Sequence, residues 1–546
     1  MPKGLDFGTE MRSMKKLFIF GAWMLAAVVS RAALPQPDLI AQIHFAGAQQ
    51  ISHGKDFSAF TNEFASDEAH ALASQTFDKL SRAPGAWLKN KLAAGATDGA
   101  AQLRPLLDDL LVSEWFFEAR DTASGSPEYV LAVRLSNERA ELWSKNLASV
   151  LSGWTGIGIT QGKPGAWSLK KHEAPNLFQF SRVGDWVLID CGQNSLSLVE
   201  KVIGSIKSQT MGTNWLAADL NWPRLAQLVP GFKGWDLPEA KFTVSAAAEN
   251  LHINGKLLLP ENFTGALPNW QIPTNTIHQP FVSFTAARGL GAWLNAQPWA
   301  KTYEIAPAPN QFFIWGLANV PYQTFMATPV ANAAGALAQS YAHLSPVFNS
   351  PVVVGNFFSH IKLEKTNDII RFTGIPFISA YLQAVTEKNG QFLLAGAFPN
   401  TPRSKPLPPE LFTRLAQKNL AYYHWEITAE RFPQLLNLTQ LGMVLSDRQQ
   451  LAANSVALKW MQKTTPALGN TITEVFQTGP DELTFNRLAP GGLTAFELIA
   501  LGHWLEAKNF PGCDLKLPPR PNFNNRRLHP PGAMRVPTSP AVPVAH

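Results

Sequence analysis

The stretch from Phe178 to Pro230 constrains the fold most, because it reads as a β-hairpin, a helix, a strand and a short helix in succession. Two apolar, β-prone runs, 178–183 and 186–191, flank Gly184-Asp185, where the chain is predicted to turn back on itself. Apolar residues then recur at helical spacing, at Leu196, Val199, Val202, Ile203 and Ile206. The stretch therefore predicts a module that mixes antiparallel strands with helices.

A fainter copy of this pattern occupies residues 389–436. Gly184 and 186–188 match Gly390 and 392–394 at an offset of 206 (390 − 184). At an offset of 207, Asp219, Leu220, Asn221, Arg224, Leu225 and Leu228 fall on Glu426, Ile427, Thr428, Arg431, Phe432 and Leu435. Two flanking pairs extend the match, 42–45 with 281–284 and 258–260 with 488–490. The pattern predicts duplicated halves with different loop insertions, and chance similarity is the alternative.

The composition is that of a globular chain. Of 546 residues, 46% are apolar and 16% are charged, which suits two to four domains with sizeable cores. Hairpins alternate with helices, and continuous buried runs are few. We therefore expect an α+β fold with antiparallel sheets and packed helices, in two duplicated halves, and not a doubly wound parallel sheet.

The remaining elements are predicted from periodicity and turn residues. We expect strands at 39–45, 281–285 and 312–317, hairpins at 114–135 and 241–259 (turning at Glu249-Asn250), helices at 330–343 and 493–507, a helix capped by Asn137, helical segments over 56–94 broken near Pro84-Gly85, and a Pro-rich loop at 399–409.

Five regions follow from these patterns. We expect a signal peptide at 1–33, a first half at 34–265, a linker at 266–280, a second half at 281–510 and a disordered, Pro-rich basic tail at 511–546.

The N-terminal region resembles a secretory leader. Lys15 and Lys16 precede an uncharged apolar run, 17–29, and Ser30-Arg31-Ala32 is a small-x-small cleavage site, with Met14 a candidate translation start. The run is shorter than the roughly 20 residues that span a bilayer. We expect an extracytoplasmic protein, periplasmic or secreted; a retained N-terminal membrane anchor is the alternative. No later stretch is long and apolar enough to span a membrane.

The basic character lies at the two ends. The sequence pI is about 9.1, but residues 1–33 hold five basic and two acidic side chains, and residues 515–546 hold five basic and none acidic. Of the chain's 46 basic and 40 acidic residues, 36 and 38 remain between them. A near-neutral body gives no support to nucleic-acid binding. The tail is the candidate contact for an anionic envelope component or protein.

Sequence signatures of catalysis are missing. Gly153–Lys163 resembles a phosphate loop but has the wrong spacing, and neither HExxH nor G-x-S-x-G occurs. We predict no cofactor and no metal. Asp108-Asp109 and Glu114 with Glu118 are neighbouring carboxylates, for which a solvated surface is the plainer interpretation. Cys191 and Cys513 are a possible disulfide, although Cys191 on a predicted buried strand also suits a small apolar filler.

The repeat supplies one candidate constellation. Asp219 and Glu426 end a predicted strand in each half, and Arg224 and Arg431 sit in the helical turn that follows. Tyr422 and His424 share the face of Glu426 by strand alternation. The functional hypothesis is a ligand-binding or acid–base pocket at the strand end. The alternative is an ion pair and N-cap that orient a short helix.

Two segments, NWLAADLNWPRLAQL at 214–228 and GGLTAFELIALGHWL at 491–505, resemble those of uncharacterised exported bacterial proteins of unknown function with two related α+β halves. This resemblance implies neither an activity nor functional residues. Two classes of function remain: a non-catalytic envelope or secreted protein that binds or scaffolds, which the missing catalytic signatures favour, and an exported glycan-acting hydrolase. Trp side chains buried between sheet and helix would favour the first class, and two facing acids in an aromatic cleft would favour the second.

Overall fold

The computed structural model describes residues 38–48, 65–89, 92–121, 127–170, 178–192, 195–208, 211–228, 238–259, 267–277, 280–289, 291–296, 309–318, 323–348, 361–375, 378–399, 409–445 and 451–512. The predicted leader and the Pro-rich segment 513–546 lie outside these ranges.

The first half runs from residue 39 to residue 258. Its strands are β1 (Leu39–Phe45), β2 (Trp115–Arg120), β3 (Glu128–Arg134), β4 (Ile159–Gln161), β5 (Trp167–Leu169), β6 (Phe178–Val183), β7 (Trp186–Cys191), β8 (Asn214–Leu220), β9 (Glu239–Ala247) and β10 (Asn250–Leu258). Its helices are α4 (Asp67–Leu88), α5 (Ala100–Val112), α6 (Asn137–Thr155), α7 (Ser195–Ser208) and α8 (Trp222–Leu228).

The second half runs from residue 281 to residue 506. Its strands are β11 (Phe281–Arg288), β12 (Gln311–Leu317), β13 (Thr324–Val330), β14 (Lys362–Thr366), β15 (Ile369–Thr373), β16 (Tyr381–Glu387), β17 (Gly390–Gly396), β18 (Leu420–Ile427), β19 (Asn470–Gln477) and β20 (Glu482–Ala489). Its helices are α9 (Gly291–Ala296), α11 (Ala333–Phe348), α12 (Pro409–Leu415), α13 (Thr428–Leu445), α14 (Val456–Thr464), the 3₁₀ turn η3 (Thr465–Ala467) and α15 (Ala495–Glu506).

The twenty described strands form one antiparallel sheet, and the fold is α+β, as predicted. In the first half neighbouring strands follow the order 4-5-6-7-3-2-1-8-9-10. In the second half they follow 14-15-16-17-13-12-11-18-19-20, the same order with ten added. Strands β10 and β20 join the halves. The common order makes the two halves comparable position by position, whereas their origin by duplication stays a prediction.

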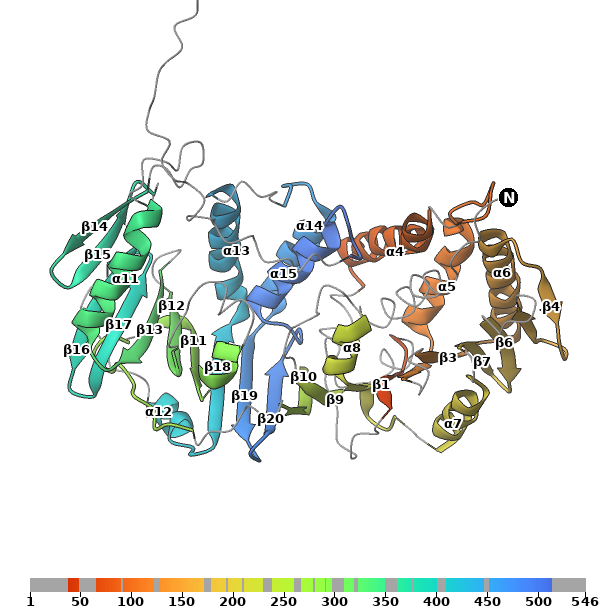
Figure 1. The fold of residues 1–546 in the computed structure, drawn as a ribbon, viewed down its shortest axis with the longest axis horizontal. Helices are drawn as coiled ribbons and strands as arrows, with labels where there is room; N and C mark the ends of the chain where they lie inside the picture. Colours follow the sequence, from red (N-terminus) through yellow and green to blue (C-terminus); the bar gives the residue numbers. More distant parts are fainter. Residues whose placement is uncertain are drawn as a thin grey trace, which may run out of the picture.

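Helices lie on both faces of this sheet. Figure 1 shows α13, α14, α15, α4, α5 and α6 in a row along one side of the elongated molecule, with α7 and α12 on the other side. Trp143 and Trp154 of α6 belong to the first-half core on one face of the sheet, and Leu198 and Val202 of α7 pack against the opposite face. Helix α4 of the first half packs against α14 of the second and donates hydrogen bonds to the end of α15, in an apolar cluster that also contains residues of α13. A shared helical layer therefore spans the junction that β10 and β20 make in the sheet.

The segment predicted as a linker packs on the second half. Within 267–277, Ile277 is fully buried in the core that contains Phe284 and Trp315. Arg288 on β11 donates hydrogen bonds to the carbonyls of Pro268, Leu420, Gln417 and Lys418. These contacts attach the segment to β11 and to the start of β18.

Three local predictions need correction. Helix α4 continues through Pro84, and Gly85 is needed because a Cβ there would approach the Asp98 carbonyl oxygen to 2.7 Å. The side chain of Ser136, and not that of Asn137, caps α6 by accepting from the Arg139 backbone N–H.

The third correction concerns the hairpin between β9 and β10. It turns at Ala248-Glu249, one residue earlier than predicted, because both residues adopt positive φ (50° and 61°), as the primed turns of tight hairpins require. Sequence analysis also missed β13, which pairs with β12 and β17.

Candidate functional site

Four of the six predicted site residues lie together in the second half. Tyr422, His424 and Glu426 alternate along β18 on the face covered by α13 and α15, and Arg431 lies in the first turns of α13. The other two, Asp219 and Arg224, belong to the first half and make separate contacts.

Glu426 is an internal acceptor and is only 2% exposed. Its Oε1 accepts hydrogen bonds from Thr428 Oγ1 at 2.9 Å and from the backbone N–H of Ala495, the first residue of α15, at 2.7 Å. Its Oε2 lies 3.3 Å from His424 Nε2, without hydrogen-bond geometry, while His424 Nδ1 is 2.8 Å from Thr285 Oγ1. Although burial opposes it, the nearby His424 ring, the Ala495 N–H and the Thr428 hydroxyl hold the pKa of Glu426 below its usual value. This carboxylate therefore anchors α15 as an anion.

Arg431 is a buried cation that lacks a contacting carboxylate among the described residues. It is 4% exposed, and its hydrogen bond there runs from Nη1 to Gln434 Oε1 at 2.8 Å. Burial lowers its pKa to about 10, and the charge of Glu426 opposes that shift. Gly316 on β12 makes room for it, because a Cβ at residue 316 would come within 2.5 Å of Arg431 Nη1.

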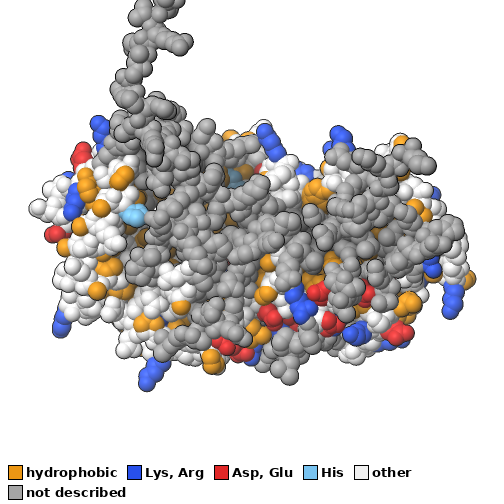
Figure 2. Space-filling view, viewed as in Figure 1, with side chains coloured by type: hydrophobic (Ala, Val, Ile, Leu, Met, Phe, Trp, Pro, Cys, Tyr) orange, Lys and Arg blue, Asp and Glu red, His pale blue; other side chains and the backbone are white. Residues whose placement is uncertain are grey.

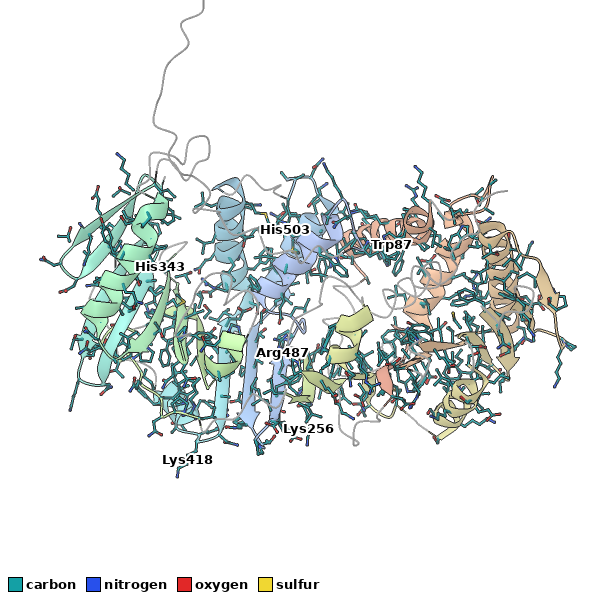
Figure 3. The ribbon with its side chains drawn as sticks, in the orientation of Figure 1. Trp87, Lys256, His343, Lys418, Arg487 and His503 are labelled. Atoms are coloured by element: carbon teal, nitrogen blue, oxygen red, sulfur yellow. The ribbon has the colours of Figure 1, made fainter. Side chains whose placement is uncertain are left out.

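An ion pair extends the polar cluster toward the junction of the halves. Arg487 on β20 contacts Glu497 of α15 at 2.8 Å and donates from Nε to Thr473 Oγ1 at 2.9 Å. Figure 3 places Arg487 at β20, below α15. Burial raises the pKa of the neighbouring Tyr422 to about 12, so its hydroxyl stays protonated.

Asp219 and Arg224 are engaged within the first half. Asp219 Oδ2 is 2.7 Å from Lys241 Nζ, directly across from it on β9. Burial raises the pKa of Asp219, and the Lys241 ammonium opposes this. Arg224 Nη1 lies 3.9 Å from Asp121 Oδ2, and Asn221 Oδ1 caps α8 by accepting from the Arg224 N–H.

The two carboxylates predicted to be equivalent lie on opposite faces of the sheet. Directly paired residues point to the same side, and one such row runs His424, Thr473, Arg487, Ile253, Val244, Leu216. His424 and Glu426 therefore share the face of Leu216, and Asp219, three residues along β8, points to the other face.

The strand pairing corrects the offset from 207 to 206 in this segment. The pairing of β8 with β9 shifts register between Asn214 and Leu216, and the pairing of β18 with β19 shifts between Leu420 and Tyr422, so equivalent positions are 206 apart (420 − 214; 422 − 216). The starts of α8 and α13, Trp222 and Thr428, are also 206 apart. Asp219 corresponds to Trp425 and Leu220 to Glu426. A one-residue change in register exchanges the faces of every side chain, so matching residue character misaligned the strands.

The face of the sheet that α13 and α15 cover in the second half differs in polarity from the equivalent face of the first half. The first half places a purely apolar set there: Ala41, Ile43, Ala218, Leu220, Leu225, Ala240 and Phe242. Pairing and helix starts assign to these positions the second-half residues Ser283, Thr285, His424, Glu426, Arg431, Thr471 and Thr473. An apolar core is thus compatible with this scaffold, and the second half carries polar groups that the topology does not require.

The opposite face shows the reverse exchange. Glu118, Gln42, Asp219 and Lys241 form a row across β2, β1, β8 and β9 in the first half. Their second-half equivalents are Trp315, Phe284, Trp425 and Ile472 on β12, β11, β18 and β19. A polar row with three charged residues in one half therefore corresponds to an apolar row with three aromatic residues in the other.

A pocket of about 480 Å³ opens beside this aromatic row, next to α12. Its lining consists of Pro280, Phe281, Phe284, Glu410, Leu411, Arg414, Tyr423, Trp425 and Ile472. Both its volume and its largely apolar lining are typical of small-molecule sites. Sequence analysis missed it, although Tyr423 and Trp425 alternate with the residues that were singled out on β18.

The neighbouring carboxylates noted in the sequence serve as structural ion pairs. Asp108 pairs with Arg104, and Asp109 accepts from Arg139 and from the Trp143 indole. Glu114 contacts His44 and Arg134, and Glu118 contacts Arg120 and Gln42. The charged side chains on the coloured parts of the face in Figure 2 are interspersed by sign.

One of the two cysteines of the predicted disulfide lies outside the described residues. Cys191 is buried on β7, and Cys513 lies outside the described ranges. Within those ranges, no group of three His, Cys, Asp or Glu side chains is placed to hold a metal ion. The helices described there include none long and apolar enough to cross a bilayer.

Comparisons with known proteins do not assign this chain to a family. A scan of protein-family models finds no match, and neither does a search of curated proteins. The solved structures include one described as "Structure of crystal form I of TP0453", which is 8% identical over 43% of this chain and 100% of that chain, with a TM-score of 0.20. Similarity at this level carries no argument about fold or function.

Proposed function

We propose that this chain is an exported, non-catalytic protein that binds an apolar small molecule in the second-half pocket, in a binding or scaffolding role at the cell envelope or outside the cell. The observation that carries the proposal is the aromatic-lined pocket beside α12. Export rests on the leader-like sequence 14–33. The strands follow the same order in the two halves, and segments 184–188 and 390–394 match in sequence. Both observations support an origin by duplication.

Two observations favour binding over glycan hydrolysis. Hydrolases of glycosidic bonds use two carboxyl groups that face each other across the bond, whereas Glu410 is the one carboxylate among the described residues that line the pocket. In addition, six Trp side chains are buried inside the protein: Trp115, Trp143, Trp154, Trp167, Trp315 and Trp460 are each at most 6% exposed. Burial of these tryptophans supports the binding or scaffolding class.

Binding of a neutral apolar dye tests the proposal. We expect Nile red to bind the full chain at one saturable site, and Trp425→Ala to weaken that binding about tenfold, because a lost aromatic wall costs about 1.4 kcal/mol of binding free energy. Fluorescence titration gives the dissociation constants. Phe496→Ala removes a 65%-exposed aromatic side chain on α15 and serves as the matched control. Equal binding by wild type and Trp425→Ala would remove the pocket from the proposal.

The basic tail supplies the second part of the proposal, contact with an anionic envelope component. Residues 515–546 carry five basic side chains and no acidic one, so binding through them should weaken as salt rises. We expect anionic lipid vesicles to retain the full chain at low salt but not at high salt, and to release a form that ends at Asp514 at both. Retention of the shortened form would show that the tail is not the contact.

A further inference from the structure

We infer that the ligand of the second-half pocket is an organic cation with an aromatic or apolar body. This inference rests on the proposed function, because it assigns a ligand class to the same pocket. It is drawn from the arrangement of the aromatic rings and from the charged residues that line the pocket.

The rings present faces in several directions. Phe281 and Trp425 meet edge to face, with centroids 6.0 Å apart and planes at 77°. Phe281 and Phe284 are tilted by 36° at 6.1 Å, and Phe284 and Tyr423 by 47° at 6.5 Å. The faces of aromatic rings carry negative electrostatic potential and attract cations, most strongly when the site is desolvated. Phe284 and Tyr423 are buried, whereas Phe281 and Trp425 are half-buried, and the 77° between the planes of these two rings allows one cationic group to contact both.

The charged residues that line the pocket also favour a cationic ligand. Glu410 and Arg414 lie four residues apart on α12. Arg414 Nη1 is already 3.3 Å from Glu474 Oε1, so its charge is largely balanced. Glu410 has no Lys, Arg or His within ion-pair distance among the described residues, and it lines the pocket. Among the described residues, the pocket lining therefore has one carboxylate without an ion-pair partner, which favours a cationic over an anionic ligand.

The first half shows that this arrangement is specific to the second. The positions of Phe284, Trp425 and Ile472 are held there by Gln42, Asp219 and Lys241. Lys241 is 2% exposed and pairs with Asp219, so that region contains an internal ion pair in place of an aromatic box. We accordingly expect one cation site per chain.

Three probes that share a benzyl or phenyl body separate the possible ligand charges: benzyltrimethylammonium, benzyl alcohol and benzenesulfonate. We expect benzyltrimethylammonium to displace Nile red at least fivefold more effectively than benzyl alcohol, and benzenesulfonate to be the weakest competitor. Glu410→Gln should reduce the affinity for the cation about threefold and leave Nile red binding unchanged. Glu141→Gln, an exposed substitution on α6, is the matched control.

The outcomes distinguish this inference from the proposed function. If Nile red binds but benzyl alcohol or benzenesulfonate competes as well as the cation, or if none of the three competes, the cation inference is wrong and the apolar pocket remains. If Glu410→Gln leaves cation affinity unchanged, the assignment of Glu410 is wrong. If Nile red does not bind either, the proposed function itself fails.

Discussion

Glu426→Leu should lower the free energy of unfolding by about 4 kcal/mol, because removing one member of a buried charged network leaves its partners uncompensated. The backbone N–H of Ala495 and the hydroxyl of Thr428 lose their shared acceptor. Arg431, which is 4% exposed, loses the nearby negative charge that offsets the cost of burying its guanidinium group. Urea unfolding at neutral pH measures the change, and a loss below about 1 kcal/mol, the scale of one neutral hydrogen bond, would contradict it.

Asp190→Asn should stabilise the protein at pH 7.5 by about 2 kcal/mol. Asp190 lies on β7 and is 3% exposed; it accepts hydrogen bonds from Ser195 Oγ and from Gln179 Nε2, which an asparagine Oδ1 can also accept. Burial raises its pKa from 3.8 to about 6, and the nearby Glu128 charge adds to the shift. A shift of this size corresponds to about 3 kcal/mol that ionisation costs the folded state.

The sign of this effect sets the pH at which it appears. Because the folded pKa lies above the unfolded one, the folded state binds more protons between pH 3.8 and about 6, and stability falls as pH rises through that window. The advantage of Asp190→Asn should therefore be complete above pH 6 and vanish near pH 4. Ser197→Ala, on the adjoining turn of α7, controls for general effects there. An advantage that is the same at pH 4.5 and 7.5 would exclude ionisation as its cause.

The sequence predicts the helices and strands of this protein better than it predicts how the residues of the two halves align. The module from 178 to 228 has the predicted hairpin, helix, strand and short helix, because turn residues such as Gly184 and the helical spacing of Leu198 and Val202 are local signals. The comparison of Asp219 with Glu426 fails because it follows residue character. Strand pairing shows that polar and apolar faces are exchanged between the halves, and only tertiary pairing reveals such an exchange.

The candidate site was only partly predicted from the sequence. Tyr422, His424, Glu426 and Arg431 do cluster, since strand alternation and the following helical turn place them on one side. The pocket was not predicted, because the aromatic residues of β18 alternate with its polar ones in one unbroken run, Tyr422 to Glu426, and this run does not show which face lines a pocket. Its walls also come from β11, β19 and α12, which are distant in sequence.

The most direct test of the positional equivalence of the two halves is the free energy of unfolding of the double variant Glu426→Leu/Arg431→Leu beside that of Glu426→Leu alone. Leu220 and Leu225 occupy the equivalent positions in the first half and are buried there. If the halves correspond at an offset of 206, the double variant should recover more than half of the stability that Glu426→Leu loses, because a buried charged network can be replaced by apolar side chains of similar size. A double variant as unstable as the single variant, or more so, would contradict the equivalence.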